Sequence, residues 1–323
     1  MKLPRLYVVM LRYRVASMVA IFMLLGAAHE GRLELGLRYV WAALALASSY
    51  VAATALNDLA DEEIDRVNHP RDAGRPLVEG TATRGELLVL HVVASVLAVA
   101  AAVPLGTRAV ALLVAALAIS QLYSARPVRL SYRVAGAPIV LGIAYVLIPY
   151  SLGVLAARGE LGDAVSTLTF ALFLLFTARI VLKDFRDRAG DARYGKATLL
   201  LRFGKAVTCG TSLVALLVAD VVLALALDVR LLLLLQPFVA AIGWTLRCLW
   251  LADHGRAEQV AIGLGARLGN GVLLCVLAWT VLAGSGATLA EAFGLTTAIA
   301  AAFLLSFAAL AARPQHVVIG YKG

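Results

Sequence analysis

The sequence predicts an all-α membrane protein, a polytopic bundle of nine or ten transmembrane helices. Three observations support this fold class. Of the 323 residues, 62% are hydrophobic, and the mean hydropathy is +0.88, well above what soluble domains show. These residues gather in runs long enough to cross a bilayer as helices. Basic residues concentrate in alternate loops, as they do in multi-pass membrane proteins.

Ten apolar runs give the expected helices in chain order. They span residues 15–29, 36–56, 87–104, 108–123, 135–156, 163–182, 206–227, 230–252, 266–284 and 291–312. The second, fourth and sixth runs lead directly into polar stretches. Because no linker or low-complexity tract separates the runs, we predict one domain over residues 1–323.

The net charge of +9 could indicate nucleic-acid binding, but the distribution of the basic residues points to membrane topology instead. They follow the second, fourth and sixth runs and precede the first one, whereas the opposite loops carry only scattered arginines. Since basic loops stay in the cytoplasm, we predict that these loops and the amino terminus are cytoplasmic. The expected location is a bacterial or archaeal cell membrane, with no nucleic-acid partner.

Two acidic motifs with the same spacing follow the second and sixth runs. The first consists of Asn57 followed by Asp58, Asp61 and Asp65, and the second of Asp184, Asp187 and Asp191. On a helix of 3.6 residues per turn each trio of aspartates shares one face. Carboxylates so close repel one another unless a cation neutralises them. Oxygen ligands in this number suit Mg²⁺, which proteins often bind together with substrate phosphates. The sequence therefore predicts a site for a magnesium diphosphate.

Basic residues close to these motifs could bind the diphosphate. Arg71 and Arg75 follow the first motif, Arg126 and Arg129 follow the fourth run after Tyr123, and Lys196 follows the second motif. A guanidinium group grips phosphate oxygens with two parallel donors. The alternative is that Arg126, Arg129 and Arg133 only fix topology against anionic lipid.

Some polar residues lie within apolar runs. We expect His91, Gln121, Gln236 and Asn270 to form interhelical hydrogen bonds. Asp220 marks a cavity or a partner, or else is a structural carboxyl group. The three cysteines, Cys209, Cys248 and Cys275, have no spacing that indicates a disulfide or a zinc site, so we interpret them as packing residues.

These motifs resemble the UbiA superfamily of intramembrane prenyltransferases. The resemblance rests on the two acidic motifs, on Arg75-Pro76-Leu77 with Gly80, on Tyr123-Ser124, on Gly136 with Pro138 and Gly142, and on Gly195-Lys196 with Thr198-Leu199. It spans about residues 57–200 in order and spacing. It implies a helical bundle around a central cavity, closed by cytoplasmic loops, that ionises a prenyl diphosphate with Mg²⁺ and passes the cation to an acceptor. Members usually have nine helices, so the run at 291–312 would be an additional tenth.

The resemblance also implies roles for individual residues. Asn57, Asp61, Asp187 and Asp191 would be the inner contacts to the metal and diphosphate, supported by Asp58, Asp65 and Asp184. Of these, Asp61, Asp187 and Asp191 are predicted as the catalytic carboxylates. The predicted diphosphate-binding residues are Arg75, Arg126, Arg129, Lys196 and Tyr123. Tyr123 or Tyr150 could also stabilise an allyl cation through its ring face.

The predicted function is Mg²⁺-dependent transfer of a prenyl group from a prenyl diphosphate to a small acceptor, in quinone, lipid or terpenoid biosynthesis. The acceptor would be an aromatic or quinone precursor or a polar lipid precursor. A terpene cyclase of the same fold is one alternative, because the cation could close on its own chain. A secondary transporter is an alternative from another class, in which acids such as Asp220 would carry ions.

Overall fold

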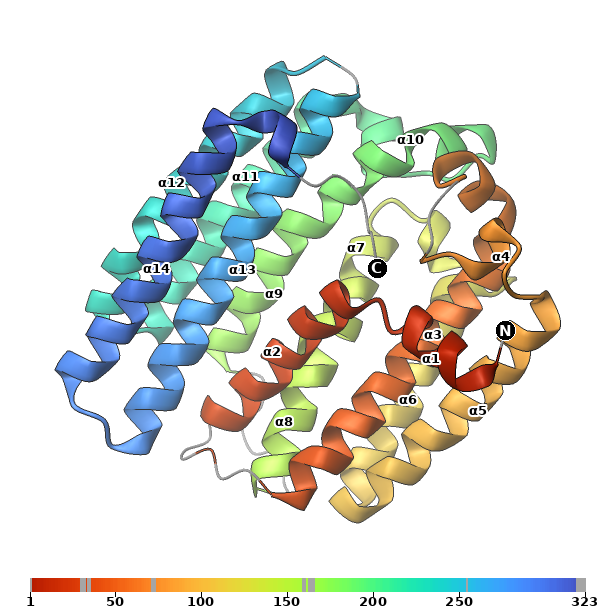
Figure 1. Ribbon diagram of the computed structural model, residues 1–323, viewed down its shortest axis with the longest axis horizontal. Helices are drawn as coiled ribbons and strands as arrows, with labels where there is room; N and C mark the ends of the chain where they lie inside the picture. The colour runs from red at the N-terminus through yellow and green to blue at the C-terminus, as the bar shows by residue number, and fades with distance from the viewer. Residues whose placement is uncertain are drawn as a thin grey trace.

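A computed structural model describes residues 2–29, 33, 36–70, 74–158, 161, 166–253 and 255–317. Within these residues the regular elements are all helical (Figure 1). The longer helices are α2 (Tyr13–His29), α3 (Leu37–Asn68), α5 (Arg84–Ala102), α6 (Thr107–Ser124), α8 (Ile148–Arg158), α9 (Thr167–Ile180), α11 (Leu199–Ala226), α12 (Val229–Leu251), α13 (Arg256–Ser285) and α14 (Leu289–Ala312). The shorter α-helices are α1 (Leu3–Met10), α4 (Pro76–Glu79), α7 (Gly136–Gly142) and α10 (Asp184–Arg193).

Within the described residues each predicted apolar run is largely helical, and residues 163–165 of the sixth run lie outside them. In the described part of the chain, 8 helices are long and apolar enough to cross a membrane, or up to 9 if α1 and α2, bent by 68°, form one span. Helix α9 has only 14 residues, which is short for a span. The run at 135–156 is divided into α7, the π-helical turn Ile143–Leu147 and α8. The predicted all-α polytopic bundle is confirmed, and the protein is an integral multi-pass membrane protein.

The helices pack as a ring of neighbours. Helix α2 packs on α8 and α13, α13 on α12 and α14, α11 on α9 and α12, and α3 on α5 and α6. In Figure 1, α11 to α14 lie on the left and α3, α5 and α6 on the right, with α10 at the upper end. Helix α14 packs on the outside of α13 and α12, and is therefore an addition to the ring.

Glycines permit the close crossing of α2 and α8. A Cβ atom built on Gly153 would lie 1.8 Å from the carbonyl oxygen of Met23, and one on Gly26 would lie 2.0 Å from that of Tyr150. Any side chain at either position would push the two helices apart. This crossing fixes α2, which contributes to the wall of the cavity described below.

The polar residues inside the apolar runs form the predicted interhelical hydrogen bonds. Gln121 contacts His91 at 3.0 Å. Gln236 Nε2 donates to Asp220 Oδ1 at 3.1 Å, which joins α12 to α11 and gives the intramembrane carboxyl group a structural partner. The three cysteines are free thiols.

Candidate active site

A cavity of about 770 Å³ opens at the end of the bundle where α3 ends and α10 begins. Its deeper wall is apolar and aromatic, with Phe22, Tyr50, Tyr145 and Phe176 among the lining residues. Three of these rings pack in sequence, since Tyr145 lies 6.0 Å from Tyr50 and 5.6 Å from Phe176 between centroids. The cavity therefore joins a polar mouth to an apolar interior.

Helix α10 brings the second acidic motif onto the end of α3. The backbone N–H of Gly190 donates to Asn68 Oδ1 at 2.6 Å, and a Cβ at Gly190 would lie 2.7 Å from the carbonyl oxygen of Ile64. His69 Nε2, one residue beyond α3, donates to Asp187 Oδ1 at 2.9 Å. The two motifs thus lie at the same end of the bundle, as the sequence predicted.

Asp61 and Asp191 face each other across this junction, with Lys196 between them. Lys196 Nζ lies 3.5 Å from Asp61 Oδ2 and 3.5 Å from Asp191 Oδ1. Arg129 Nη2 donates to Asp61 Oδ1 at 2.9 Å and to the Ala60 carbonyl at 2.8 Å. The chain's own cations therefore neutralise carboxylates that would otherwise repel one another.

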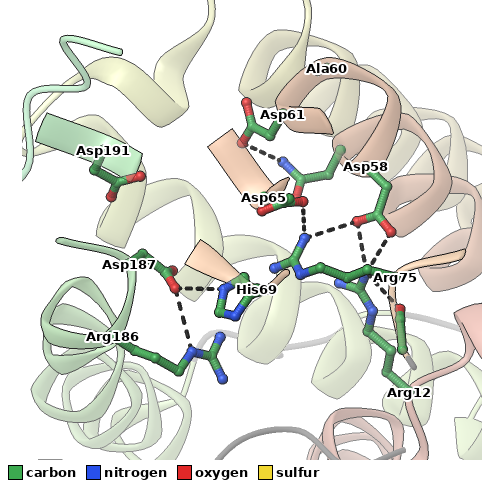
Figure 2. Close-up of polar contacts among 12 residues, drawn as sticks. Arg12, Asp58, Ala60, Asp61, Asp65, His69, Arg75, Arg186, Asp187 and Asp191 are labelled. Atoms are coloured by element: carbon green, nitrogen blue, oxygen red, sulfur yellow. Dashed lines mark hydrogen bonds and ion pairs between the residues drawn. The ribbon is translucent and has the colours of Figure 1, made fainter. Parts of the chain in front are cut away.

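Asp191 combines complete burial with unsatisfied oxygens. Its side chain lines the cavity at 0% exposure, and neither carboxylate oxygen has a hydrogen-bond partner. In Figure 2 no dashed line joins its carboxylate to the other residues labelled there, and its ion pair with Lys196 is long, at 3.5 Å. A buried acceptor without a donor is unfavourable, and a hard divalent cation would satisfy it. The carboxylate and amide oxygens of Asn57, Asp61 and Asp191 suit Mg²⁺, although no group of three His, Cys, Asp or Glu side chains among the described residues is already arranged around a metal position.

Burial raises the pKa of Asp191 to about 6, and the positive charges of Lys196 and Lys183 offset this only in part. Because the pKa of Asp191 in the folded protein exceeds its usual 3.8, the folded state favours the protonated carboxyl group. The free energy of unfolding is therefore highest below about pH 4 and falls as the pH rises through about 6. At about 1.4 kcal/mol per unit, the shift corresponds to about 3 kcal/mol.

We therefore expect Asp191→Asn to raise the thermal stability of the metal-free protein above pH 6 and to leave it unchanged near pH 4. Melting curves in detergent with a chelator, recorded from pH 4 to pH 8, measure the difference. Adding Mg²⁺ should stabilise the wild-type protein and not the variant. Equal melting temperatures of both proteins at pH 8 would contradict this account of Asp191.

Asp187, unlike Asp191, has partners that stabilise its charged form. Burial raises the pKa of Asp187, but the hydrogen bond from His69 and the charges of Arg186 and Lys183 outweigh it, and the net shift is downward. Burial lowers the pKa of His69, and the hydrogen bond to Asp187 opposes this only in part. Asp187 is therefore a persistent anion at the cavity mouth.

Two arginines surround the outer part of the first motif. Arg12 Nη2 lies 2.7 Å from both carboxylate oxygens of Asp58. Arg75 Nη1 reaches Asp58 at 3.4 Å and also pairs with Asp65. Arg12 and Arg129 are the only non-glycine residues in the described ranges with positive φ, 44° in both. This left-handed conformation is strained for arginine, and it persists where the side chain grips an aspartate.

The predicted site residues do not all lie at the cavity. Those that line the cavity are Asn57, Asp61, Asp65, Asp187, Asp191, Arg75, Lys196 and Tyr123. Asp58 and Asp184 are buried outside it, on Arg12 and Lys183. Arg129 reaches the site through Asp61, whereas Arg126 is exposed. Tyr150 is buried outside the cavity, and Arg71 lies outside the described residues.

Arg12, His69 and Arg186 belong to this site but are not among the residues that the motifs predict. His69 follows the first motif by one helical turn, so its position after Asp65 was a local signal. Arg12 offered no such signal, because its partner Asp58 lies 46 positions away in the sequence.

Fold and site together define a polytopic membrane protein with a cation-neutralised acidic site at the mouth of an apolar cavity. The chain belongs to the UbiA prenyltransferase family, whose family model matches residues 16–264. This confirms the resemblance found in the motifs and the class of protein expected from it.

Relatives and solved structures agree with this family. The chain is 30% identical over 156 residues to a digeranylgeranylglyceryl phosphate synthase of Pyrococcus abyssi, covering 48% of this chain and 52% of the relative. A synthase of the same name from Methanothermobacter thermautotrophicus is 28% identical over 204 residues, covering 62% and 68%. The chain thus spans about half the length of the first of these relatives.

Among solved structures, one described as a digeranylgeranylglyceryl phosphate synthase in membranes superposes with a TM-score of 0.65 at 18% identity, covering 87% of this chain and 99% of the other. A UbiA homologue from Archaeoglobus fulgidus bound to GPP and Mg²⁺ superposes with a TM-score of 0.58 at 15% identity, covering 95% and 99%. At these identities the likeness concerns the fold.

Proposed function

We propose that this protein is a Mg²⁺-dependent prenyltransferase that moves a prenyl group from a prenyl diphosphate to a polar lipid precursor. The observation that carries the proposal is the meeting of Asp61 and Asp191 around Lys196 at the mouth of an apolar cavity. A prenyl diphosphate has an anionic head and a hydrocarbon tail, and these are the two environments that the cavity offers. We propose that the whole chain acts as one domain and that the acidic end faces the cytoplasm, as the basic loops predict.

Asn57, Asp61, Asp187 and Asp191 would hold the metal, with Asp65 near them on the cavity wall. Bound Mg²⁺ would neutralise charge on the diphosphate and assist its departure as a leaving group. Lys196, Arg129 and Arg75 would turn from their carboxylates to the phosphate oxygens. Donors already placed at the mouth strengthen as charge develops on the bridging oxygen.

The aromatic wall below the mouth has the second chemical role. Tyr50, Tyr145 and Phe176 line the cavity, where the first isoprene unit would lie in this proposal, and the faces of aromatic rings attract a cation. The apolar lining would also keep water from capturing the allyl cation. These rings would share the role that the sequence offered to Tyr123 or Tyr150, of which Tyr123 also lines the cavity and Tyr150 does not.

The proposed acceptor is a prenylated glyceryl phosphate. The relatives that the chain resembles over about half their length are named for a glyceryl phosphate that carries two geranylgeranyl groups, which supports a prenylated glyceryl phosphate as acceptor. An aromatic or quinone precursor is the second candidate acceptor. Family membership favours transfer over transport, and Asp220, paired with Gln236 outside the cavity, offers little support for ion movement.

The test uses purified protein in lipid nanodiscs, Mg²⁺ and geranylgeranyl diphosphate labelled in the prenyl chain. Prenylglyceryl phosphate, an aromatic carboxylic acid or no acceptor is added in parallel. We expect labelled diprenylglyceryl phosphate and no cyclised hydrocarbon by mass analysis. Hydrocarbon products without acceptor would replace the proposal with a terpene cyclase, and metal-independent uptake without diphosphate release would replace it with a transporter.

A further inference from the structure

The cavity extends beyond its aromatic wall into a part that other helices form. The rings of the aromatic wall belong to α2, α3, α9 and the π-helical turn before α8. The other part, which we call the α12 part of the cavity, is lined by α11, α12 and α13, with Leu216, Ile242, Leu246 and Ile262 in its wall. One cavity therefore has two apolar walls of different composition.

Two hydroxyl groups in the wall of the α12 part donate to backbone carbonyls. Thr245 of α12 is 2% exposed, and its hydroxyl group donates to the Ile242 carbonyl at 2.7 Å. The hydroxyl group of Ser212 on α11 donates to the Ala178 carbonyl of α9 at 2.5 Å. Because both donors are already used, this wall offers a ligand mainly hydrocarbon surface. Such a surface suits an apolar chain rather than a polar head group.

The chain after α14 forms another part of the cavity wall. This segment, residues 314–317, is called the α14 turn below, and its last two residues line the cavity. Val317 is 7% exposed and packs in one apolar cluster with Leu264 of α13. Arg256 Nη2, in the first turn of α13, donates to the Gln315 carbonyl at 2.9 Å. The α14 turn is thus fixed against α13.

The α14 turn lies outside the part of the chain that matches the family. The family model ends at residue 264, whereas Asp61 and Asp191 of the cavity mouth lie within the matched range. The residues of the proposed chemistry are therefore inside the match, and this part of the cavity wall is outside it. A wall of this kind affects which substrates fit rather than the reaction itself.

We propose that the α12 part of the cavity takes the hydrocarbon chain of a lipid acceptor, and that Val317 determines which chains fit. The inference rests on the proposed function and deepens it by naming the class of acceptor. Transfer of a prenyl group to a lipid brings two hydrocarbon chains to one mouth. The aromatic wall serves the donor, because its ring faces attract the developing cation, so the α12 part is the apolar space left for the acceptor. A small aromatic acid would leave that space unfilled.

Gly269 offers a way to fill this space. It lies with Ile262, Ala266 and Leu273 on the face of α13 that lines the cavity, at the spacing of one helix face. A Cβ atom at Gly269 would meet no atom of the described residues within 4 Å. Gly269→Leu should therefore place its side chain in the cavity without displacing α13 from its neighbours.

Binding to the protein in nanodiscs is measured first, so that the test does not depend on catalysis. The probes are geranylgeranylglyceryl phosphate, glycerol 1-phosphate, which lacks the chain, and geranylgeranyl diphosphate with Mg²⁺. We expect Gly269→Leu to weaken binding of the acceptor lipid about tenfold or more, and to change binding of the diphosphate less than about twofold. In steady-state assays the KM for the acceptor should rise and the KM for the donor should stay unchanged.

Gly210→Leu is the matched control. Gly210 lies on the exposed face of α11 and does not line the cavity, and a Cβ atom there would also meet no atom of the described residues within 4 Å. Leucine raises the helix propensity in both variants, so a difference between them reports on the cavity. Gly269→Ala, which adds a single methyl group, replaces the leucine variant if that variant does not fold.

Val317→Ala tests the wall in the opposite direction. It opens space beside the α14 turn, so the affinity for an acceptor one isoprene unit longer should rise at least about threefold relative to geranylgeranylglyceryl phosphate. Arg313→Gln is its control, because Arg313 is exposed immediately before the turn and does not line the cavity. This control should keep the chain-length preference of the wild-type protein.

Three results would overturn the proposal. They are unchanged acceptor binding in the Gly269 variant together with an unchanged chain-length preference in Val317→Ala, a loss of affinity confined to the donor, and glycerol 1-phosphate that binds as tightly as the lipid. If acceptor binding depends on Gly269 and Val317 but the wild-type protein transfers no prenyl group, the lipid site stands and the proposed transferase function fails.

Discussion

Asp61→Asn and Asp191→Asn should each lower Mg²⁺-dependent diphosphate release at least about a hundredfold in a protein that remains folded. Each change removes an anionic oxygen ligand from the cavity mouth and preserves the shape of the side chain. Asp61 also holds Lys196 and Arg129, so its loss should affect both halves of the site. Asp191 accepts no hydrogen bond and has only the ion pair with Lys196 at 3.5 Å to lose, so the effect of its substitution should follow the metal more closely.

Release of diphosphate from labelled geranylgeranyl diphosphate, measured over a range of Mg²⁺ concentrations, tests this expectation. Asp228→Asn is the matched control, because Asp228 is the exposed N-cap residue of α12 at the other end of the bundle. The activity of this variant should equal that of the wild-type protein. Retention of a tenth of the wild-type rate by both site variants at saturating Mg²⁺ would disprove the metal assignment.

Asp58→Asn should act on stability, with a loss of about 3 kcal/mol or more. Asp58 is 2% exposed and both of its oxygens contact Arg12, so the amide would leave a largely buried guanidinium without its counter-charge. Chemical or thermal unfolding in detergent measures the change. The double variant Arg12→Gln with Asp58→Asn should recover most of the loss, because it removes both charges together.

Glu62→Gln is the control for the loss of a carboxylate from an ion pair on the same helix. Its partners Arg66 and Arg84 are 54% and 64% exposed, and such pairs contribute less than about 1 kcal/mol. Asp58→Asn could instead lose no more stability than Glu62→Gln and show no Mg²⁺-dependent diphosphate release. That result would identify Asp58 as a metal ligand, as the motif alone suggested.

The sequence could predict the helices and the identity of the acidic motifs, because both depend on local patterns. Apolar runs define spans by length, and the spacing of Asp184, Asp187 and Asp191 defines one helix face. The spacing of the first motif could not show that Asp58 and Asp61 have different surroundings. Both belong to one sector of α3, yet Asp58 contacts Arg12 and Asp61 lines the cavity. That difference depends on how α1 and α2 bend at Arg12, which is a tertiary contact.

The partners of individual charges also depend on packing that no local pattern encodes. His69 reaches Asp187 only because Gly190 lets α10 lie against α3. Arg126 and Arg129 are equivalent in the sequence, but only Arg129 has the left-handed backbone that turns its side chain onto Asp61. The confirmed part of the prediction is therefore the fold and the family, and the roles of individual residues stay predictions.

Lys196 has a consequence for the turnover of the enzyme. Its ammonium group stands between Asp61 and Asp191, in the place where the acids would otherwise demand a counter-ion. In the proposed function, entry of a metal diphosphate would be an ion exchange, in which Lys196 gives up two carboxylates and gains phosphate oxygens. After transfer of the prenyl group, the same lysine could return to its carboxylates and favour release of the diphosphate. A resident cation would therefore lower the affinity for both the bound donor and the released diphosphate.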